Sequence, residues 1–127
     1  MPIPKSIKIN KARDAISLKF AGSDTFHISA EFLRVMSPSA EVRGHSPDKA
    51  ILQTGKRDVV IEDIQKTGNY ALRIYFDDGH DSGIYSWDYL HDLVINHAKY
   101  WSQYLKELHT RGKSREKEMQ VLKMFDA

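Results

Sequence analysis

The stretch that decides the fold is YALRIYFDDGHDSGIYSWDYLHDLVINHAKYWSQYLKEL, residues 70–108. It begins with alternating apolar residues, passes through the polar turn Asp77-Asp78-Gly79-His80, and returns through a short apolar segment. Alternation with a period of two is typical of a strand buried on one face, so this part predicts two strands joined by a turn. Ser86 then stands where a helix N-cap is expected, with Asp88 in the first helical turn.

Apolar residues after Ser86 recur at alternating spacings of four and three, which is the spacing of a single helix face. The residues of this stripe are Leu90, Val94, His97, Trp101, Tyr104 and Leu108, with Leu93 and Leu105 beside them. We therefore expect one long helix of about 24 residues that ends at Gly112. Ser114 is expected to cap a further short helix that carries Met119, Leu122 and Phe125.

The residues before this stretch predict further strands. The expected strands are Ser6–Asn10, Ala15–Phe20, Thr25–Ile28, Val59–Ile64, Tyr70–Phe76 and a short one around Ser82–Tyr85. Ser29 is expected to cap a short helix, Ala30–Met36, after the third strand. Because the strands cluster before the long helix, parallel βαβ units are not favoured. We predict an α+β fold in which a mostly antiparallel sheet of about five to six strands packs on the long C-terminal helix.

The chain of 127 residues has the size of one domain. Residues 37–56 hold two prolines and two glycines and show no clear periodicity. A connection this long is often functional or disordered.

Composition excludes several function classes. The chain has no cysteine, which excludes disulfides, thiolate catalysis, iron–sulfur ligation and zinc sites that need sulfur. No apolar run approaches the roughly 20 residues that span a bilayer, and the N-terminus lacks the apolar core of a secretory signal. We therefore expect a cytoplasmic protein with no membrane contact.

The charge distribution is uneven although the net charge is only +2. Residues 77–92 carry acids without Lys or Arg, and residues 99–123 carry mostly bases. The helix dipole favours this order on a solvated helix, and a functional basic patch is the alternative. Aromatic residues among the bases could stack on a single-stranded nucleic acid, but their helical spacing favours core packing. Nucleic-acid binding is the least favoured function.

The usual catalytic and ligand-binding motifs are absent from the sequence. There is no G-x-G-x-x-G, no P-loop, no G-x-S-x-G and no H-E-x-x-H pattern. An EF-hand beginning at Asp77 fails because Ser82 takes the place of the required glycine. A plain β-turn is the favoured interpretation of residues 77–83. Because none of these motifs is present, we expect no enzymatic activity. Among the six histidines, only His45 and His80 lack an evident packing role.

Three groups of residues resemble a known family. They are LR (33–34) followed by SPSAEVRGH (37–45); GKRDV (55–59); and GNYA (68–71) leading to FDDGHDSGIYSWDYL (76–90). Together they resemble the DUF971 family, also called the gamma-butyrobetaine-hydroxylase-like N-terminal domain, in its stand-alone bacterial form. The resemblance runs from about Ser6 to about Arg115. It implies a single domain over residues 1–115, followed by a C-terminal helical tail at residues 116–127.

The resemblance implies an accessory role. Small bacterial members of this family have no assigned function. Related domains precede the catalytic domain of gamma-butyrobetaine and trimethyllysine dioxygenases, and others are appended to P-loop scaffold proteins of iron–sulfur cluster assembly. In the dioxygenases the domain binds a structural zinc through three cysteines and a histidine.

The zinc of the dioxygenases does not carry over to this chain. Only Val35, Met36 and Ser37 fill the place of the cysteine-bearing loop. His80 matches the histidine ligand and is the only metal candidate, but one imidazole cannot form a four-coordinate structural site. We expect no cofactor.

The leading hypothesis is a non-catalytic adaptor domain that binds a protein partner, linked by the resemblance to partner enzymes or to iron–sulfur assembly. Whether it also binds a small molecule is unknown. Its expected binding surface combines Arg34, Glu41, Arg43 and His45 with Asp77, Asp78, His80, Asp81, Tyr85 and Trp87. The two arginines could hold a carboxylate or phosphate. In the alternative, Arg43 and Glu41 only attach the loop to Asp77 or Asp81. A second hypothesis is weak metal handling by His45, His80 and the neighbouring aspartates.

Overall fold

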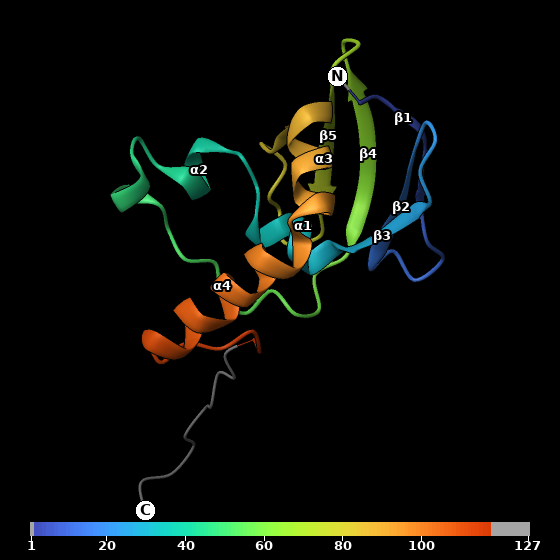
Figure 1. Cartoon of the computed structure of the whole chain (residues 1–127). Coiled ribbons are helices and arrows are strands. Elements are labelled where there is room, and N and C mark those ends of the chain that lie inside the picture. Colours follow the sequence, from blue (N-terminus) through green and yellow to red (C-terminus); the bar gives the residue numbers. More distant parts are fainter. Residues whose placement is uncertain (1, 118–127) are drawn as a thin grey trace, which may run out of the picture.

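The computed structural model describes residues 2–117 and confirms the α+β class (Figure 1). Its strands form two three-stranded antiparallel sheets in place of the single expected sheet. The first sheet has the order β1-β2-β3 and the second has the order β4-β5-β6. The bounds are β1 Pro4–Ile9, β2 Ala15–Phe20, β3 Thr25–Ser29, β4 Ile61–Thr67, β5 Ala71–Phe76 and β6 Ile84–Ser86. Strand β4 begins at Ile61, whereas the sequence predicted that it would begin two residues earlier, at Val59.

The first sheet ends at β3, which leads directly into a helix. Ser29 ends β3 and caps the helix α1, Ala30–Val35, by accepting a hydrogen bond from the Phe32 backbone. The second sheet is attached instead through Arg13, in the turn after β1. The Arg13 carbonyl accepts from the Ile61 backbone N–H at 2.8 Å, and Arg13 Nε donates to the Ile61 carbonyl at 2.7 Å.

Both sheets bury their apolar faces in one core. The alternation that predicted β2 and β5 places Ile16 and Leu18 of β2, and Ile74 and Phe76 of β5, in this core. Burying side chains of this size is the main favourable contribution to folding, at roughly 1.5–3 kcal/mol each.

The expected long helix is two helices, and the single-helix prediction is wrong. Helix α3 runs over Trp87–Ile95 and helix α4 over His97–Thr110. The interruption lies at Asn96, whose side-chain amide donates to the Asp92 carbonyl and to Asp92 Oδ1 at 3.2 and 2.7 Å. A short polar side chain that bonds to the preceding turn competes with regular helix geometry.

The break divides the apolar stripe between two clusters. Leu90 and Val94 join the main core, whereas Tyr104 and Leu108 form a smaller cluster with Val35 of α1. Figure 1 shows α3 lying against β4 and β5, and α4 running obliquely below them.

The expected caps at Ser86 and Gly112 are confirmed. Ser86 accepts a hydrogen bond from the Tyr89 backbone at the start of α3. After α4, Gly112 has a φ of 63°, its N–H donates to the His109 carbonyl, and the Lys113 N–H donates to the Leu108 carbonyl. This pair of bonds is the Schellman arrangement that glycine favours. The further helix expected with Met119, Leu122 and Phe125, and the tail with it, lies outside the described residues from 118 onward.

Residues 37–56 contain two short helical segments that the sequence did not predict. Helix α2, Ala40–Arg43, is capped by Ser39, and a 3₁₀ turn follows at Pro47–Lys49. Figure 1 shows α2 and the chain after it on the side of the molecule away from the β1-β2-β3 sheet. Over residues 2–117, none of the helices has the length and apolar character needed to cross a membrane.

Candidate functional site

Asp78, in the turn after β5, is the centre of a charge network. Its Oδ2 atom accepts from Arg34 Nε at 2.8 Å and from Lys56 Nζ at 2.6 Å. Its Oδ1 atom accepts from the His80 backbone N–H at 3.1 Å. Arg34 also donates to Gln53 Oε1 at 2.9 Å, so it joins the β5–β6 turn to the chain that follows α2.

The partners of Asp78 keep it ionised. Burial alone would raise the pKa of this carboxyl, but hydrogen bonds from Lys56, the His80 backbone and Arg34 outweigh burial. The net effect lowers the pKa of Asp78 to about 2. The Arg34 side chain is only 8% exposed. A buried guanidinium needs a paired carboxylate, so Arg34 and Asp78 depend on each other.

His80 forms a second polar cluster next to the first. The ring is buried; its Nε2 shares a hydrogen bond of 2.7 Å with Ser37 Oγ, and its Nδ1 lies 3.4 Å from Glu41 Oε2. Burial lowers the pKa of His80, and the Arg34 charge adds to this, against the opposing effect of Glu41. The neutral imidazole therefore joins the start of the loop to the β5–β6 turn at neutral pH.

Ser37, His80 and Glu41 are connected in the order of a serine-hydrolase triad. Ser37, however, is fully buried, and its Oγ also accepts from the Ser39 N–H at 3.3 Å. A Cβ atom at Gly83 would lie 2.7 Å from the same Oγ. The backbone of Gly83 therefore lies close to the Ser37 hydroxyl, which is enclosed.

The residues present do not fit the zinc that the resemblance implies. The one candidate ligand, His80, has Ser37 Oγ on one ring nitrogen and Glu41 beside the other. The chain has no thiolate, and a neutral serine hydroxyl is not among the usual zinc ligands. Within residues 2–117, no three His, Asp or Glu side chains are close enough together to hold a metal ion. The metal-handling hypothesis therefore finds no ligand set in this part of the chain.

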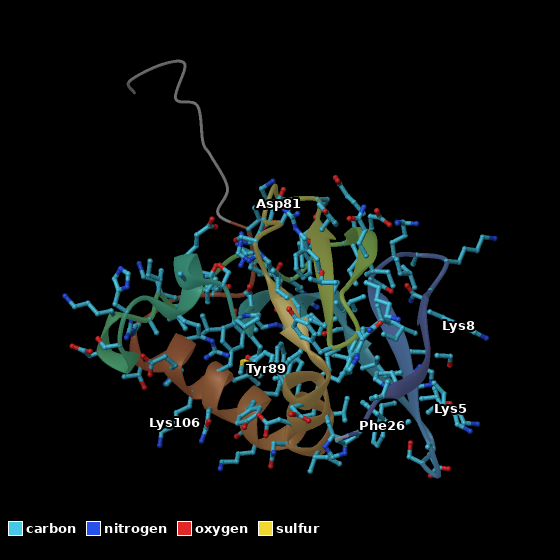
Figure 2. All side chains as sticks on the ribbon, turned by 90° about the horizontal axis from the view of Figure 1, so that it is seen from above. Lys5, Lys8, Phe26, Asp81, Tyr89 and Lys106 are labelled. Carbon is cyan, nitrogen blue, oxygen red and sulfur yellow. The ribbon has the colours of Figure 1, made fainter. Side chains whose placement is uncertain are left out.

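The structure brings together four of the ten predicted site residues: Arg34, Glu41, Asp78 and His80. The other six have separate contacts. Arg43 donates to Tyr89 Oη and to the Met36 carbonyl, and His45 is exposed just after α2. Asp77 accepts from the Val60 N–H, and Asp81 pairs with Arg73. Tyr85 Oη donates to the Leu33 carbonyl, and Trp87 Nε1 donates to the Asn69 carbonyl. In Figure 2, Asp81 lies at the outer edge of the molecule and Tyr89 lies toward its middle.

Sequence reasoning missed Ser37, Gln53 and Lys56, which complete the network. The sequence did not indicate a role for Gln53 or Lys56, because single polar residues are common in loops without periodicity. Ser37 lies in the short segment that replaces the family's cysteine-bearing loop, opposite His80. This position could have identified Ser37 as a partner of His80. The alternative in which Arg43 and Glu41 attach the loop to Asp77 or Asp81 is wrong in its partners. Glu41 lies beside His80, and Arg43 donates to Tyr89 Oη.

The attached loop and α4 enclose a groove. A cavity of about 210 Å³ lies between them, and we call it the α2–α4 groove. Its lining is Val35, Val42, Arg43, Ala50, Ile51, Leu52, Gln53, Tyr104, Glu107 and Arg111. A second hollow of about 330 Å³ shares Ala50, Ile51, Leu52 and Arg111 with it and adds Thr54 and Lys113.

Together, the fold and its network define a small α+β domain that holds a long loop on its surface by buried polar contacts. The chain belongs to the family described as gamma-butyrobetaine hydroxylase-like, N-terminal, which it matches over residues 7–91. This match ends before Arg115, where the resemblance was expected to end.

Solved structures agree with the family. The chain is 46% identical to a protein with an NMR solution structure, covering 98% of both chains with a TM-score of 0.81. A second NMR structure is 38% identical, covering 100% of this chain and 95% of the other with a TM-score of 0.77. A crystal structure of a DUF971 protein of unknown function from Acidithiobacillus ferrooxidans is 30% identical, covering 71% and 90% with a TM-score of 0.59. No curated protein matches the chain.

Proposed function

We propose that the protein is a non-catalytic accessory domain that binds a protein partner through the α2–α4 groove. The observation that carries this proposal is the position of Ile51, which is 60% exposed although the loop around it is held by partly buried polar contacts. A large apolar side chain held at an exposed position is typical of a binding surface when it borders a groove.

The buried network supports the proposal through its energetics. Buried ion pairs contribute little net stability, because desolvation offsets the attraction between the charges. The ion pairs of Asp78 with Arg34 and Lys56 instead hold the loop in a defined position. Tyr104 adds a further attachment from α4 by donating its hydroxyl to the Gln53 carbonyl at 2.8 Å. A loop with a single conformation presents a preorganised groove, which lowers the entropy lost on binding.

The binding role is tested with two isoleucines of equal exposure. Ile51 lies in the groove and is 60% exposed, and Ile95, at the end of α3 and outside the groove lining, is 59% exposed. We expect Ile51→Asp to lose partners that the wild type and Ile95→Asp both retain from a native lysate. Binding of the purified partner is then measured by calorimetry. Equal retention by all three proteins would contradict a binding role for this groove.

The non-catalytic part of the proposal is tested at Ser37. Because its hydroxyl is enclosed, we expect no covalent labelling by a fluorophosphonate probe, which reacts with activated serines. Mass spectrometry of the intact protein measures the labelling. An adduct formed by the wild type but not by Ser37→Ala would show that Ser37 is an activated nucleophile and would contradict the non-catalytic proposal.

The resemblance suggests which partners to try first. Accessory domains of this family occur with dioxygenases and with scaffold proteins of iron–sulfur assembly, so we propose enzymes and assembly proteins of these kinds as first candidates. The absence of cysteine is compatible with a reducing compartment, and we propose the cytoplasm as the location.

A further inference from the structure

The charges around the α2–α4 groove are predominantly positive. Arg43, Arg111 and Lys113 line the groove and its adjoining hollow, and Glu107 is the one carboxylate in these two linings. Glu107 already accepts from Arg111 Nε at 2.7 Å. The groove surface therefore carries more cationic than anionic groups before any partner binds.

Arg43 has only uncharged partners among the described residues. Its Nη2 atom donates to Tyr89 Oη and, at 3.3 Å, to the Met36 carbonyl, and its guanidinium lies 5.7 Å from the centre of the Tyr89 ring. Glu41, two residues away, is directed to His80 instead. A guanidinium that is held in place without a carboxylate is well suited to receive one from a partner.

The floor between these cations is apolar. Val42 and Tyr104 are buried beneath the groove, Leu52 is partly buried, and Ile51 forms an exposed wall. A ligand that covers this surface must present an apolar side chain there, because burial of Ile51 is favourable only against another apolar group.

We infer that the α2–α4 groove takes an acidic amphipathic segment of a partner protein. An apolar side chain of this segment packs against Ile51 and Leu52, and carboxylates on either side pair with Arg43 and with Arg111 or Lys113. This inference rests on the proposed function and adds the chemistry of the partner. A cationic or uncharged segment would leave Arg43 without a carboxylate partner and gains less from this surface.

The test is selection of random 12-residue peptides displayed on phage against the immobilised full chain. We expect the enriched peptides to combine acidic residues with Leu, Ile or Phe. A selected peptide, synthesised and measured by calorimetry, should bind Arg111→Gln/Lys113→Gln about tenfold more weakly than the wild type, since losing charged hydrogen bonds costs roughly 1.5–3 kcal/mol. Ile51→Asp should abolish binding, and Ile95→Asp should leave it unchanged.

The outcomes separate the two proposals. Peptides that need Ile51 but are basic or uncharged would overturn the acidic chemistry and leave the binding function standing. Failure to enrich any peptide sensitive to Ile51→Asp would overturn both. Occupation of the groove by the chain's own residues 118–127 is a separate outcome of the test: a tenfold gain in peptide affinity for Leu122→Asp/Phe125→Asp would overturn the inference in their favour. Dimers in sedimentation that Ile51→Asp abolishes would overturn it in favour of a second copy.

Discussion

At the scale of single residues, the polar side chains inside this domain act as attachments between distant parts of the chain. Asp78 joins α1, the end of the long loop and the β5–β6 turn. His80 joins the beginning of the same loop to the same turn through Ser37. Each attachment is made by a group whose pKa is shifted by its surroundings, so its contribution to stability depends on pH.

Asp78→Asn should lower the free energy of unfolding by about 1 kcal/mol at pH 7, because Arg34 and Lys56 lose their shared carboxylate and solvent screens this partly exposed group. The pKa of Asp78 is lowered from 3.8 to about 2, so its contribution is complete above pH 3.8 and is lost as the pH falls toward 2. Urea unfolding between pH 7 and pH 3 measures both effects. Asp81→Asn, at an exposed position, is the matched control and should change little. A difference that does not shrink at low pH would contradict this role of Asp78.

His80 should make the protein less stable as the pH falls below about 6.5. Its pKa is lowered in the folded state by burial and by Arg34, while Glu41 and Asp78 oppose this effect and Lys56 adds to it. The unfolded chain therefore binds a proton more readily. His80→Gln removes the titrating group, and the loss of stability between pH 7 and pH 5 should become smaller in this variant than in the wild type. His109→Gln, exposed on α4, serves as the control. An identical pH dependence in all three proteins would exclude His80 as its source.

At the scale of elements, the ends of the helices decide where the site residues lie. The break at Asn96 lets α4 leave the direction of α3, so that Tyr104 and Leu108 reach Val35 and Leu52. The Schellman turn at Gly112 then reverses the chain, and Ser114 accepts a hydrogen bond from the Gly55 backbone at 3.0 Å.

Gly112→Ala should destabilise the protein by about 1 kcal/mol, since the φ of 63° costs a residue with a Cβ roughly that amount. Apart from its two chain neighbours, no atom of residues 2–117 lies within 4 Å of the place of that Cβ, so steric contact adds nothing. Gly112→Asn should cost less than Gly112→Ala, because asparagine tolerates this conformation better. Thermal unfolding of the three proteins provides the comparison. Equal stability of Gly112→Ala and the wild type would argue against the backbone conformation as the reason for glycine here.

At the scale of the whole molecule, the chain after α4 closes the domain. Arg115 donates two hydrogen bonds, of 2.8 and 2.7 Å, to the two carboxylate oxygens of Glu31 in α1, and its guanidinium lies 5.1 Å from the Trp101 ring centre. The Glu31 side chain is only 7% exposed. The family match ends at residue 91, and this contact connects Arg115, which lies beyond the match, to α1.

Arg115→Met should lower the free energy of unfolding by about 3 kcal/mol, because it leaves the buried Glu31 carboxylate without its partner. Methionine keeps the packing on Trp101 comparable, so the effect reports mainly the lost charge. Arg57→Met, which breaks the exposed pair with Glu116, is the control and should cost less than about 1 kcal/mol. Chemical denaturation gives both values, and similar losses for the two variants would show that Glu31 does not need Arg115.

Much of the fold was predictable because it depends on local patterns. Alternation over Ala15–Phe20 and Ala71–Phe76 identifies the two central strands. Ser29 and Ser86 mark helix starts because a capping side chain bonds to backbone only two or three residues away. The same reasoning located Gly112.

The sequence by itself determined the α+β class, the helix caps, the central strands and, through its motifs, the family of this protein. Only the tertiary structure decided the division into two sheets, the break at Asn96 and the pairing of Arg34 with Asp78, which are 44 positions apart. The physical reason is that caps and alternation act over a few residues of the chain. The partner of a buried charge depends on which distant segment folding brings beside it. The α2–α4 groove likewise depends on contacts between distant segments of the chain.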